Sequence, residues 1–298
     1  MKQAILITAY RDEANLIRLL RHFSDGDAVG HFRIFVHIDT KSRELNKARV
    51  DELGIPNVEV ISKYSVCWGS IRHIYAVLDL MRMMLRHEDV SYVHVISGTD
   101  LAVRSASWFV ARFSEDQETR LNAGKFRMLD RGNKFDWYCR YWLPTTWNHR
   151  SRLMLVANDI LQKVQRAFGI TRKSLGGIDY RNLWYSHIWA SYPRDACKRI
   201  VWFAENNQAF LRALNWTTVP EEVFFATAIA DTAYESKKDI PYLRYSDWDS
   251  RRGPVPVVLD ESDYDKIAAG EYAFARKVDS QKSAKLIRLI AAKLSDKV

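Results

Sequence analysis

The sequence contains little cysteine and no long apolar run. Its three cysteines, Cys67, Cys139 and Cys197, are odd in number and belong to no CxxC or Cys/His pattern, which argues against a disulfide framework and against a zinc site. We expect free, buried thiols. No stretch approaches the roughly 18 uninterrupted apolar residues of a membrane span, and the first nine residues lack the features of a signal peptide. The sequence therefore predicts a cytoplasmic protein that does not span a membrane.

Internal repeats, low-complexity tracts and Pro/Gly-rich linkers are also absent from the 298 residues. Because 47% of the residues are hydrophobic, the chain has enough apolar side chains for one substantial core. We therefore expect a single domain over residues 1–278, followed by a basic amphipathic helix or tail over residues 279–298.

Positive charge exceeds negative charge, since 45 Lys and Arg residues against 36 Asp and Glu residues give a formal net charge of +9. Such an excess favours an anionic partner, which can be a nucleic acid, a phosphorylated small molecule or a membrane surface. Part of it lies in "SAKLIRLIAAKL" (283–294), where apolar and basic side chains follow helical spacing. This pattern is typical of a helix that rests on an anionic membrane leaflet, and equally of a last helix that packs on the core and exposes its lysines.

Apolar strands alternate with helical patterns over the first hundred residues. Strands are predicted at residues 4–10, 31–40, 57–62 and 92–100, and helices at about 12–23 and 70–86. This alternation predicts an α/β fold in which helices flank a mostly parallel central sheet. Because ligands of such sheets bind beyond the carboxyl ends of the strands, we expect "HIDTKS" (37–42), "CWGS" (67–70) and "SGTD" (97–100) at the rim of a site.

The second half of the chain is less regular. Residues 126–152 are dense in aromatic and arginine side chains. They could form an acceptor-binding loop or a nucleic-acid platform, or their rings could pack against the core, which is the more usual fate of aromatic residues. Helical patterns return at about 153–167, 194–213 and 221–231.

Two adjacent glutamates, Glu221 and Glu222, follow Pro220 at the predicted start of a helix. Successive helical side chains point about 100° apart, so the two carboxylates cannot face the same site. One of them has the ordinary role of complementing the helix dipole. The other is expected against apolar surface, where a raised carboxyl pKa would suit a general base.

Two basic pairs follow, Arg251 and Arg252 in "WDSRRGP" (248–254), and then Arg276 and Lys277 in "AFARKV" (273–278). These cations could converge on phosphate if the segment between them folds back, or they could be solvated surface charges. The strand ends carry the single aspartates Asp39 and Asp100. No DxD motif stands at the sites where a metal-dependent nucleotide-sugar enzyme would hold Mg²⁺ or Mn²⁺.

Taken in order, the segments "HIDTKS", "VCWGSIRHIYAVLDLM", "ISGTDLAV", "VPEEVFFAT" and "FARKVD" resemble the core-2/I-branching glycosyltransferase family, which includes the β-1,6-N-acetylglucosaminyltransferases. The resemblance covers residues 4–279. It implies a GT-A-type fold, a nucleotide-sugar donor that is typically UDP-linked, and transfer with inversion at the anomeric carbon without a metal or other cofactor.

The resemblance also implies roles for individual residues. In the family's Pro-Asp/Glu-Glu motif the second acidic residue is the catalytic base, which corresponds here to Glu222. The lysine that compensates the donor diphosphate corresponds to Lys277, and its arginine partner to Arg251 or Arg252. The remaining site residues implied are Asp39, Trp68 and Gly69 for the nucleoside, and Asp100, Trp189 and Trp248 for the acceptor or sugar.

Two segments depart from the family pattern. The usual Asp-x-Pro after Ser-Gly reads Asp100-Leu101-Ala102 here, and the "GSQW"-like stretch reads "YSHIW" (185–189), which leaves the acceptor pocket open. The disulfides and membrane anchor of the animal Golgi members are missing, so the resemblance is to a bacterial-type cytoplasmic enzyme, of a kind that commonly builds lipopolysaccharide or other surface glycans. N-acetylglucosamine is the commonest donor sugar; xylose, glucuronic acid, glucose and galactose are alternatives.

Two other functions remain open from the residues alone. The positive charge and the aromatic stretch around Trp137, Tyr141 and Trp142 would suit a nucleic-acid-binding module, although no RNP, KH or helix-turn-helix signature accompanies them. A transferase-like fold that serves only as a binding subunit is the third possibility. The enzyme is the leading hypothesis, with a UDP-sugar and a glycan or glycolipid as partners and no nucleic acid. Contact with an anionic membrane through residues 280–298 is a further expectation.

Overall fold

A five-stranded, mostly parallel sheet forms the centre of the molecule. The computed structural model describes residues 1–113, 121–124, 126–129, 135–230 and 242–295. The strand order is β10-β4-β1-β2-β3, and only the edge strand β10 is antiparallel to its neighbour. Its strands are β1 (Lys2–Ala9), β2 (Phe32–Ile38), β3 (Val58–Ile61), β4 (Val90–Ser97) and β10 (Ser191–Pro193). The predicted α/β class with a mostly parallel central sheet is confirmed.

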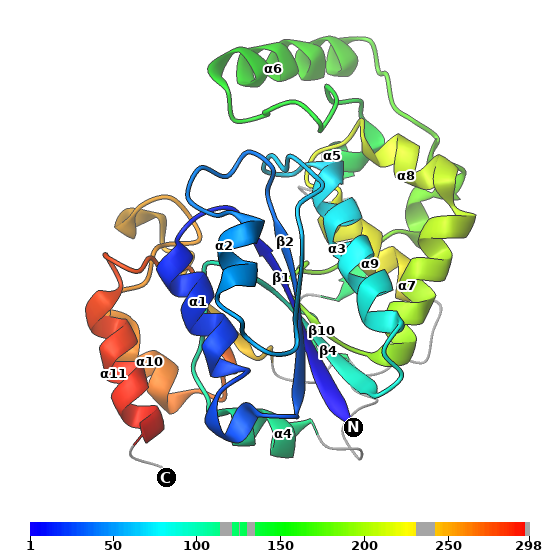
Figure 1. Cartoon of the computed structure of the whole chain (residues 1–298). Coiled ribbons are helices and arrows are strands. Elements are labelled where there is room, and N and C mark those ends of the chain that lie inside the picture. Colours follow the sequence, from blue (N-terminus) through cyan, green and yellow to red (C-terminus); the bar gives the residue numbers. More distant parts are fainter. Residues whose placement is uncertain (114–120, 125, 130–134, 231–241, 296–298) are drawn as a thin grey trace.

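Helices cover both faces of this sheet (Figure 1). Alternate residues of β1 point to opposite faces, so that Leu6 joins the core under α3, whereas Ile5 and Ile7 join the core under α1. The helices on the Leu6 side are α3 (Ile71–Leu85), α7 (Arg194–Asn206) and α9 (Glu221–Ile229), and those on the other side are α1 (Glu13–His22) and α4 (Ala106–Arg112). The two glutamates thus begin a helix that belongs to one of the covering layers.

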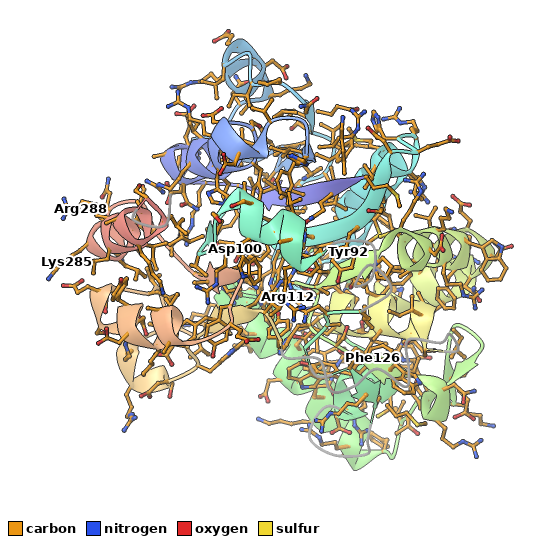
Figure 2. The ribbon with its side chains drawn as sticks, turned by 90° about the horizontal axis from the view of Figure 1, so that it is seen from below. Tyr92, Asp100, Arg112, Phe126, Lys285 and Arg288 are labelled. Carbon is orange, nitrogen blue, oxygen red and sulfur yellow. The ribbon has the colours of Figure 1, made fainter. Side chains whose placement is uncertain are left out.

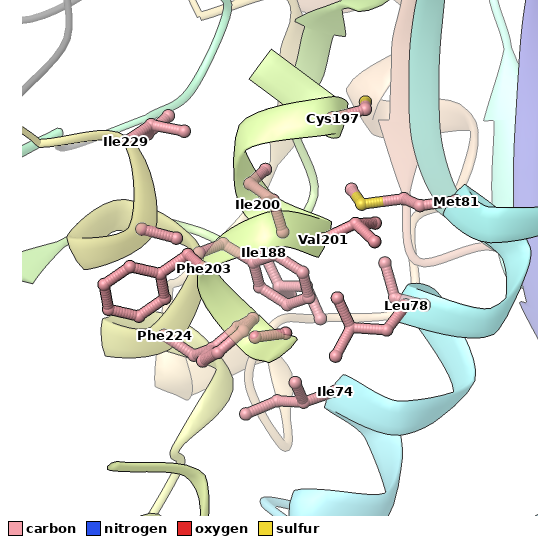
Figure 3. Close-up of a cluster of buried hydrophobic side chains, with 14 of the residues drawn as sticks. Ile74, Leu78, Met81, Ile188, Cys197, Ile200, Val201, Phe203, Phe224 and Ile229 are labelled. Atoms are coloured by element: carbon pink, nitrogen blue, oxygen red, sulfur yellow. The ribbon is translucent and has the colours of Figure 1, made fainter. Parts of the chain in front are cut away.

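Helix α9 is held by an apolar cluster between α3 and α7 (Figure 3). Phe224 is fully buried and stands 6.1 Å from Phe203 of α7, measured between ring centroids. Ile74 and Leu78 of α3 belong to the same core. From Val223 to Ile229 every side chain of α9 is buried. Because tightly packed cores leave little freedom, the start of α9 is fixed in position.

The predicted strand at residues 92–100 is in fact two strands in different sheets. Strand β4 ends at Ser97, and β5 (Asp100–Ala102) pairs with β12 (Phe274–Arg276), which pairs with β11 (Arg244–Ser246). Gly98 permits the turn, since a Cβ there would lie 2.9 Å from Cβ of Ala9. The turn brings Asp100 level with Arg276 in the β5–β12 register.

Shorter elements complete the chain. The predicted helix at 194–213 is interrupted at Asn207, so that α8 (Gln208–Leu214) is separate. The other elements are α2 (Lys47–Glu52), β6 (Arg127–Met128), α5 (Phe135–Cys139), α6 (Arg152–Ala167), β7 (Ser174–Leu175), β8 (Ile178–Asp179), β9 (Trp184–Tyr185), α10 (Tyr264–Ala269) and α11 (Ala284–Ser295), with short 3₁₀ turns between them. All three cysteines are free, but Cys67 is only partly buried, so the expectation of buried thiols is wrong for that residue.

The C-terminal helix α11 packs on the body of the molecule. Its apolar residues Leu286, Ile287 and Ile290 are buried in a cluster with Leu101 and Val103. Lys285 and Arg288 point outward, as Figure 2 shows, whereas Lys293 donates to the Ala268 carbonyl at 2.8 Å. Of the two interpretations of this segment, the structure has the packed helix, and the apolar face needed for insertion into a membrane is already covered.

We predict that Asn15 of α1 is needed to stabilise the β4–β5 turn. Its buried amide donates hydrogen bonds to the carbonyl oxygens of Gly98 (2.8 Å) and Asp100 (2.9 Å). Asn15→Ala leaves both acceptors buried without this donor, so we expect a loss of about 2 kcal/mol or more in the free energy of unfolding. Urea denaturation followed by circular dichroism measures the loss. Asn206→Ala, at the exposed end of α7, is the control and should change stability by less than about 0.5 kcal/mol; equal effects would contradict the prediction.

Candidate active site

The predicted catalytic helix begins at the rim of the central sheet, near the carboxyl ends of β1 and β4. Thr8 near the end of β1 lies within 3.2 Å of His73 Nε2, measured from its Oγ1. On its other side, Nδ1 of His73 lies 3.8 Å from Oε1 of Glu221. The first turn of α9 is therefore next to the sheet edge at which parallel α/β folds bind their ligands.

The chain enters α9 through an unusual backbone conformation. Val219 has φ of 48°, a region that β-branched residues rarely adopt and that a following proline further disfavours. The carbonyl of Val219 accepts a hydrogen bond of 3.2 Å from the hydroxyl of the buried Tyr138. Such conformations persist only where the surroundings enforce them, and they concentrate at functional sites.

The loop before α3 packs on this entry. Gly69 has φ of 65°, and a Cβ there would lie 3.4 Å from the backbone nitrogen of Val219. The neighbouring Trp68 is half-exposed, and the guanidinium of Arg150 lies 4.5 Å from its ring centroid. Gly69 therefore has a packing role, while the ring of Trp68 is accessible for the predicted contact with a nucleoside.

Glu222 is partly buried and is held by groups on neighbouring segments. Its backbone carbonyl accepts a hydrogen bond of 2.9 Å from the Ser186 amide. Burial raises the pKa of Tyr185, and the charge of Glu222 and a hydrogen bond to it raise that pKa further. Burial and the Glu222 charge also keep the pKa of Tyr138 well above its usual range. The phenols of Tyr185 and Tyr138 therefore stay protonated beside the carboxylate of Glu222. This carboxylate has a fixed position, and it can accept a proton.

Glu221 does more than the expected helix-start role. Its side chain is 8% exposed and faces His73. Its second oxygen, Oε2, is buried without a hydrogen-bond partner among the described residues. Glu221 and Glu222 thus point to different neighbours, as the 100° helical spacing requires, and the structure gives Glu221 a contact with the partly buried His73 that the sequence did not suggest.

A row of contacts leads from Glu221 to the cations near the end of the chain. The ring of His73 lies 5.4 Å from that of Trp189, and the guanidinium of Arg276 lies 4.3 Å from the Trp189 ring. Nε of Arg276 forms an ion pair of 3.0 Å with Oδ1 of Asp100. The start of α9 and the "FARK" segment, which are 54 residues apart in the sequence between Glu222 and Arg276, therefore border one region.

Lys277 lies in a region of strong positive charge. Burial lowers its pKa to about 8, and the charges of Arg276, Arg150 and Arg11 lower it too, whereas Asp100 opposes the shift. Burying several cations close together is unfavourable, and proteins arrange them in this way where they bind an anion. Sequence reasoning missed Arg150 and Arg11 in this group, although Arg276 stood next to Lys277 in the quoted motif.

The predicted arginine partners of Lys277 have other contacts. The Arg251 side chain pairs with Asp249 at 2.6 Å. Arg252 forms ion pairs with three carboxylates, at 2.5 Å to Asp247, 3.1 Å to Asp260 and 2.7 Å to Asp263. Neither guanidinium is free for a diphosphate in this arrangement, so the role of Arg251 or Arg252 stays a prediction.

Asp39 organises the loops of the expected nucleoside side. Its Oδ1 accepts a hydrogen bond of 2.7 Å from the Lys41 amide, and its Oδ2 accepts one of 3.0 Å from the Val66 amide. It thereby connects the end of β2 to the loop that carries Trp68. A carboxylate that already accepts two backbone hydrogen bonds is a positioning group first, and direct contact with a nucleoside stays a prediction.

The three predicted acceptor residues differ in accessibility. Asp100 is fully buried, with Oδ2 accepting from the Ser97 amide at 2.5 Å. Trp189 is half-buried beneath Arg276. Trp248 is 56% exposed and stacks on His187 at 6.3 Å between centroids. Of the three, Trp248 has the exposed aromatic face that sugar binding requires.

Within the described ranges, no group of three or more His, Cys, Asp or Glu side chains could hold a metal ion. A leaving phosphate can be stabilised by cations of the protein or by a metal ion. Metal-independence therefore stays a prediction. Of the helices that the structure describes, none combines the length and the apolar composition needed to cross a bilayer.

The low pKa of Lys277 predicts a pH-dependent affinity for UDP, the expected leaving group. A bound diphosphate favours charged Lys277, so binding takes up a proton above pH 8. Isothermal titration calorimetry should show UDP affinity roughly constant below pH 8 and falling by up to about tenfold per pH unit above it. Lys277→Arg keeps its charge at these pH values and should remove the dependence; an unchanged profile in this variant would refute the role of Lys277.

Comparisons with known proteins bear on the family of the chain. The family model described as Core-2/I-Branching enzyme matches residues 4–267. No curated protein matches the sequence. Among solved structures, a crystal structure of S. aureus TarS 1-349 is similar at 12% identity and a TM-score of 0.38, covering 76% of this chain and 55% of that one. A crystal structure of S. aureus TarS has 12% identity and a TM-score of 0.36, covering 72% and 33%. The chain therefore spans about half the length of the first of these.

Proposed function

Because the chain belongs to the core-2/I-branching enzyme family, we propose that it transfers a sugar from a UDP-sugar to a hydroxyl group of a glycan acceptor, with inversion at the anomeric carbon. The membership confirms the family that the resemblance named and places the chain among glycosyltransferases; the match ends at residue 267, before the "FARKVD" segment (274–279). The observation that carries the proposal is the row of contacts from Glu221 through His73 and Trp189 to Arg276. It supports a site with a carboxylate at one side and cations at the other.

In the proposed reaction Glu222 is the general base. It removes the proton of the acceptor hydroxyl as that oxygen forms a bond to the anomeric carbon. The bond from this carbon to the β-phosphate oxygen breaks on the opposite face, and its electron pair leaves with UDP. The hydrogen bond with Tyr185 orients the carboxylate toward the acceptor side of the anomeric carbon. The proton of the acceptor hydroxyl ends on Glu222.

The departing diphosphate is assigned to Lys277 and Arg150, beside Arg276, which is held by its ion pair with Asp100. We prefer these to Arg251 and Arg252, because the latter two are already paired with aspartates. Fixed cations stabilise charge that develops on a leaving phosphate, and they do so without reorganisation during the reaction. Burial and the neighbouring arginines lower the pKa of Lys277, and the diphosphate, which gains a third negative charge as the bond to the sugar breaks, offsets the repulsion among these cations.

The finer features of the substrates are also proposals. N-acetylglucosamine is the favoured sugar, on the family resemblance, and a bacterial surface polysaccharide or lipopolysaccharide is the favoured product. Trp248 offers an exposed ring to the acceptor, and Trp68 offers one to the uracil base. Both are typical of sugar and base binding by stacking.

Glu222→Gln should reduce kcat by about 10²–10⁴-fold, because it removes the proton acceptor while keeping the side-chain shape. Transfer is measured with a screen of UDP-sugars, and UDP affinity by calorimetry should stay within about threefold, since the base does not touch the diphosphate. Glu221→Gln is the matched variant one position earlier, and we expect kcat to fall by less than about tenfold. A larger loss in Glu221→Gln than in Glu222→Gln would reverse the assignment.

Transfer should also continue without divalent metal. After dialysis against EDTA the rate is expected to stay within about twofold of the untreated enzyme, because the cations of the protein compensate the diphosphate. Lys277→Ala, which removes one of these cations, should lower the rate whether or not EDTA is present. Loss of activity in EDTA with recovery on adding Mn²⁺ would show that the cation site is insufficient.

A further inference from the structure

Helix α6 (Arg152–Ala167) is polar on its inner face. Oδ1 of the buried Asn158 accepts from the Leu143 amide at 2.9 Å. Gln162 donates to the Tyr141 carbonyl at 2.8 Å, and Gln165 both donates to that carbonyl and accepts from the Tyr141 amide, each at 2.8 Å. Amide side chains, not apolar packing, therefore attach this helix to the segment before it.

The outer face of α6 is apolar. Leu153, Val156, Ile160 and Val164 follow at three- and four-residue spacing, so they form one stripe on the helix. All four are exposed, Leu153 at 76%, and the stripe continues to Phe168, which is 77% exposed. Figure 1 shows α6 at the top of the molecule, outside the layers formed by the sheet and its covering helices. Surface helices normally have the reverse arrangement, so this stripe marks an interaction surface.

The surroundings of the stripe are basic. Between residues 147 and 173 the chain has six Lys and Arg residues and one acidic residue, Asp159. Asp159 is paired with Lys163 at 2.7 Å, and Arg166 with Asp136 at 3.2 Å. Arg172 points inward to the Tyr138 carbonyl at 2.8 Å, whereas Lys173 is exposed. Arg152 begins the helix and is exposed, and Trp147 just before it exposes half of its ring. An apolar stripe bordered by cations and an aromatic residue matches the interface of an anionic bilayer.

We propose that α6 lies flat on an anionic membrane, with Leu153, Ile160 and Phe168 inserted at the level of the headgroups. A second copy of the chain fits less well, because a symmetric contact would bring the same cations of both copies together. The C-terminal helix is also less suitable, because its apolar face is buried. The surface is independent of the catalytic proposal.

Where both proposals hold, the membrane lies next to the donor site. Arg150 stands two residues before α6 and is one of the cations that lower the pKa of Lys277. A helix anchored at the bilayer would keep this site at the membrane surface. This consequence, which rests on the proposed function, favours an acceptor glycan carried on a lipid.

The test is sedimentation of the full chain with vesicles. Vesicles of equal parts phosphatidylglycerol and phosphatidylcholine should pellet the protein, and phosphatidylcholine alone should bind it at least about tenfold more weakly. Raising NaCl to about 1 M, where the Debye length is about 3 Å, should weaken binding to the anionic vesicles. Failure to bind anionic vesicles at low salt would overturn the proposal.

Leu153→Asp/Ile160→Asp should bind anionic vesicles at least about tenfold more weakly than the wild type, because it removes two inserted side chains. Val29→Asp/Leu289→Asp is the matched control, since both residues are exposed apolar positions away from α6 and Leu289 lies on α11. The control should bind as the wild type does. Equal binding by the α6 variant would refute the proposal, and so would a wild-type dimer in light scattering that this variant dissociates. Circular dichroism confirms that both variants are folded.

Discussion

The buried ion pair between Asp100 and Arg276 joins neighbouring strands of the small sheet and shapes the site where that sheet meets the end of β4. Asp100 follows directly from the turn after β4, and its carboxylate also accepts from the Ser97 amide. Arg276 lies on the small sheet and extends over Trp189. A buried pair of this kind adds little stability overall, but loss of one partner leaves an uncompensated charge and costs about 3–5 kcal/mol. Its main effect is therefore to fix where the end of β4, the indole and the cations lie.

Charge around the site is divided between its two sides. The carboxylates enter from α9, which a dense apolar core holds in place, and they contact Tyr185 and His73. The cations enter from "FARK" and from the segment before α6, and burial together with the charges of the neighbouring arginines lowers the pKa of Lys277. An inverting displacement needs this division, because the base and the leaving group act on opposite faces of one carbon. The same segment before α6 leads to the apolar stripe, so the two proposals, of donor binding and of membrane contact, involve one part of the chain.

Much of the fold follows from sequence patterns. Continuous apolar runs located the parallel strands, because burial on both faces of a parallel sheet imposes such runs, and helical spacing located the long helices. Pro220 and the glutamates after it located the start of α9, since these residues suit a helix N-terminus. The apolar run at residues 92–100 was wrongly predicted to be one strand. Period alone cannot show where a chain leaves one sheet for another, and only the close approach of Gly98 to Ala9 explains the break.

The sequence by itself determined the fold class, the family and the identity of the two adjacent carboxylates, because these depend on local spacing and on motif order. Only the tertiary structure decided which charges meet. Arg150 and Arg11 join Lys277, whereas Arg252 is held by three aspartates. The reason is that electrostatic interactions depend on the distance between charges and on their burial. Residues far apart in the chain become close and buried only when the core brings their elements together.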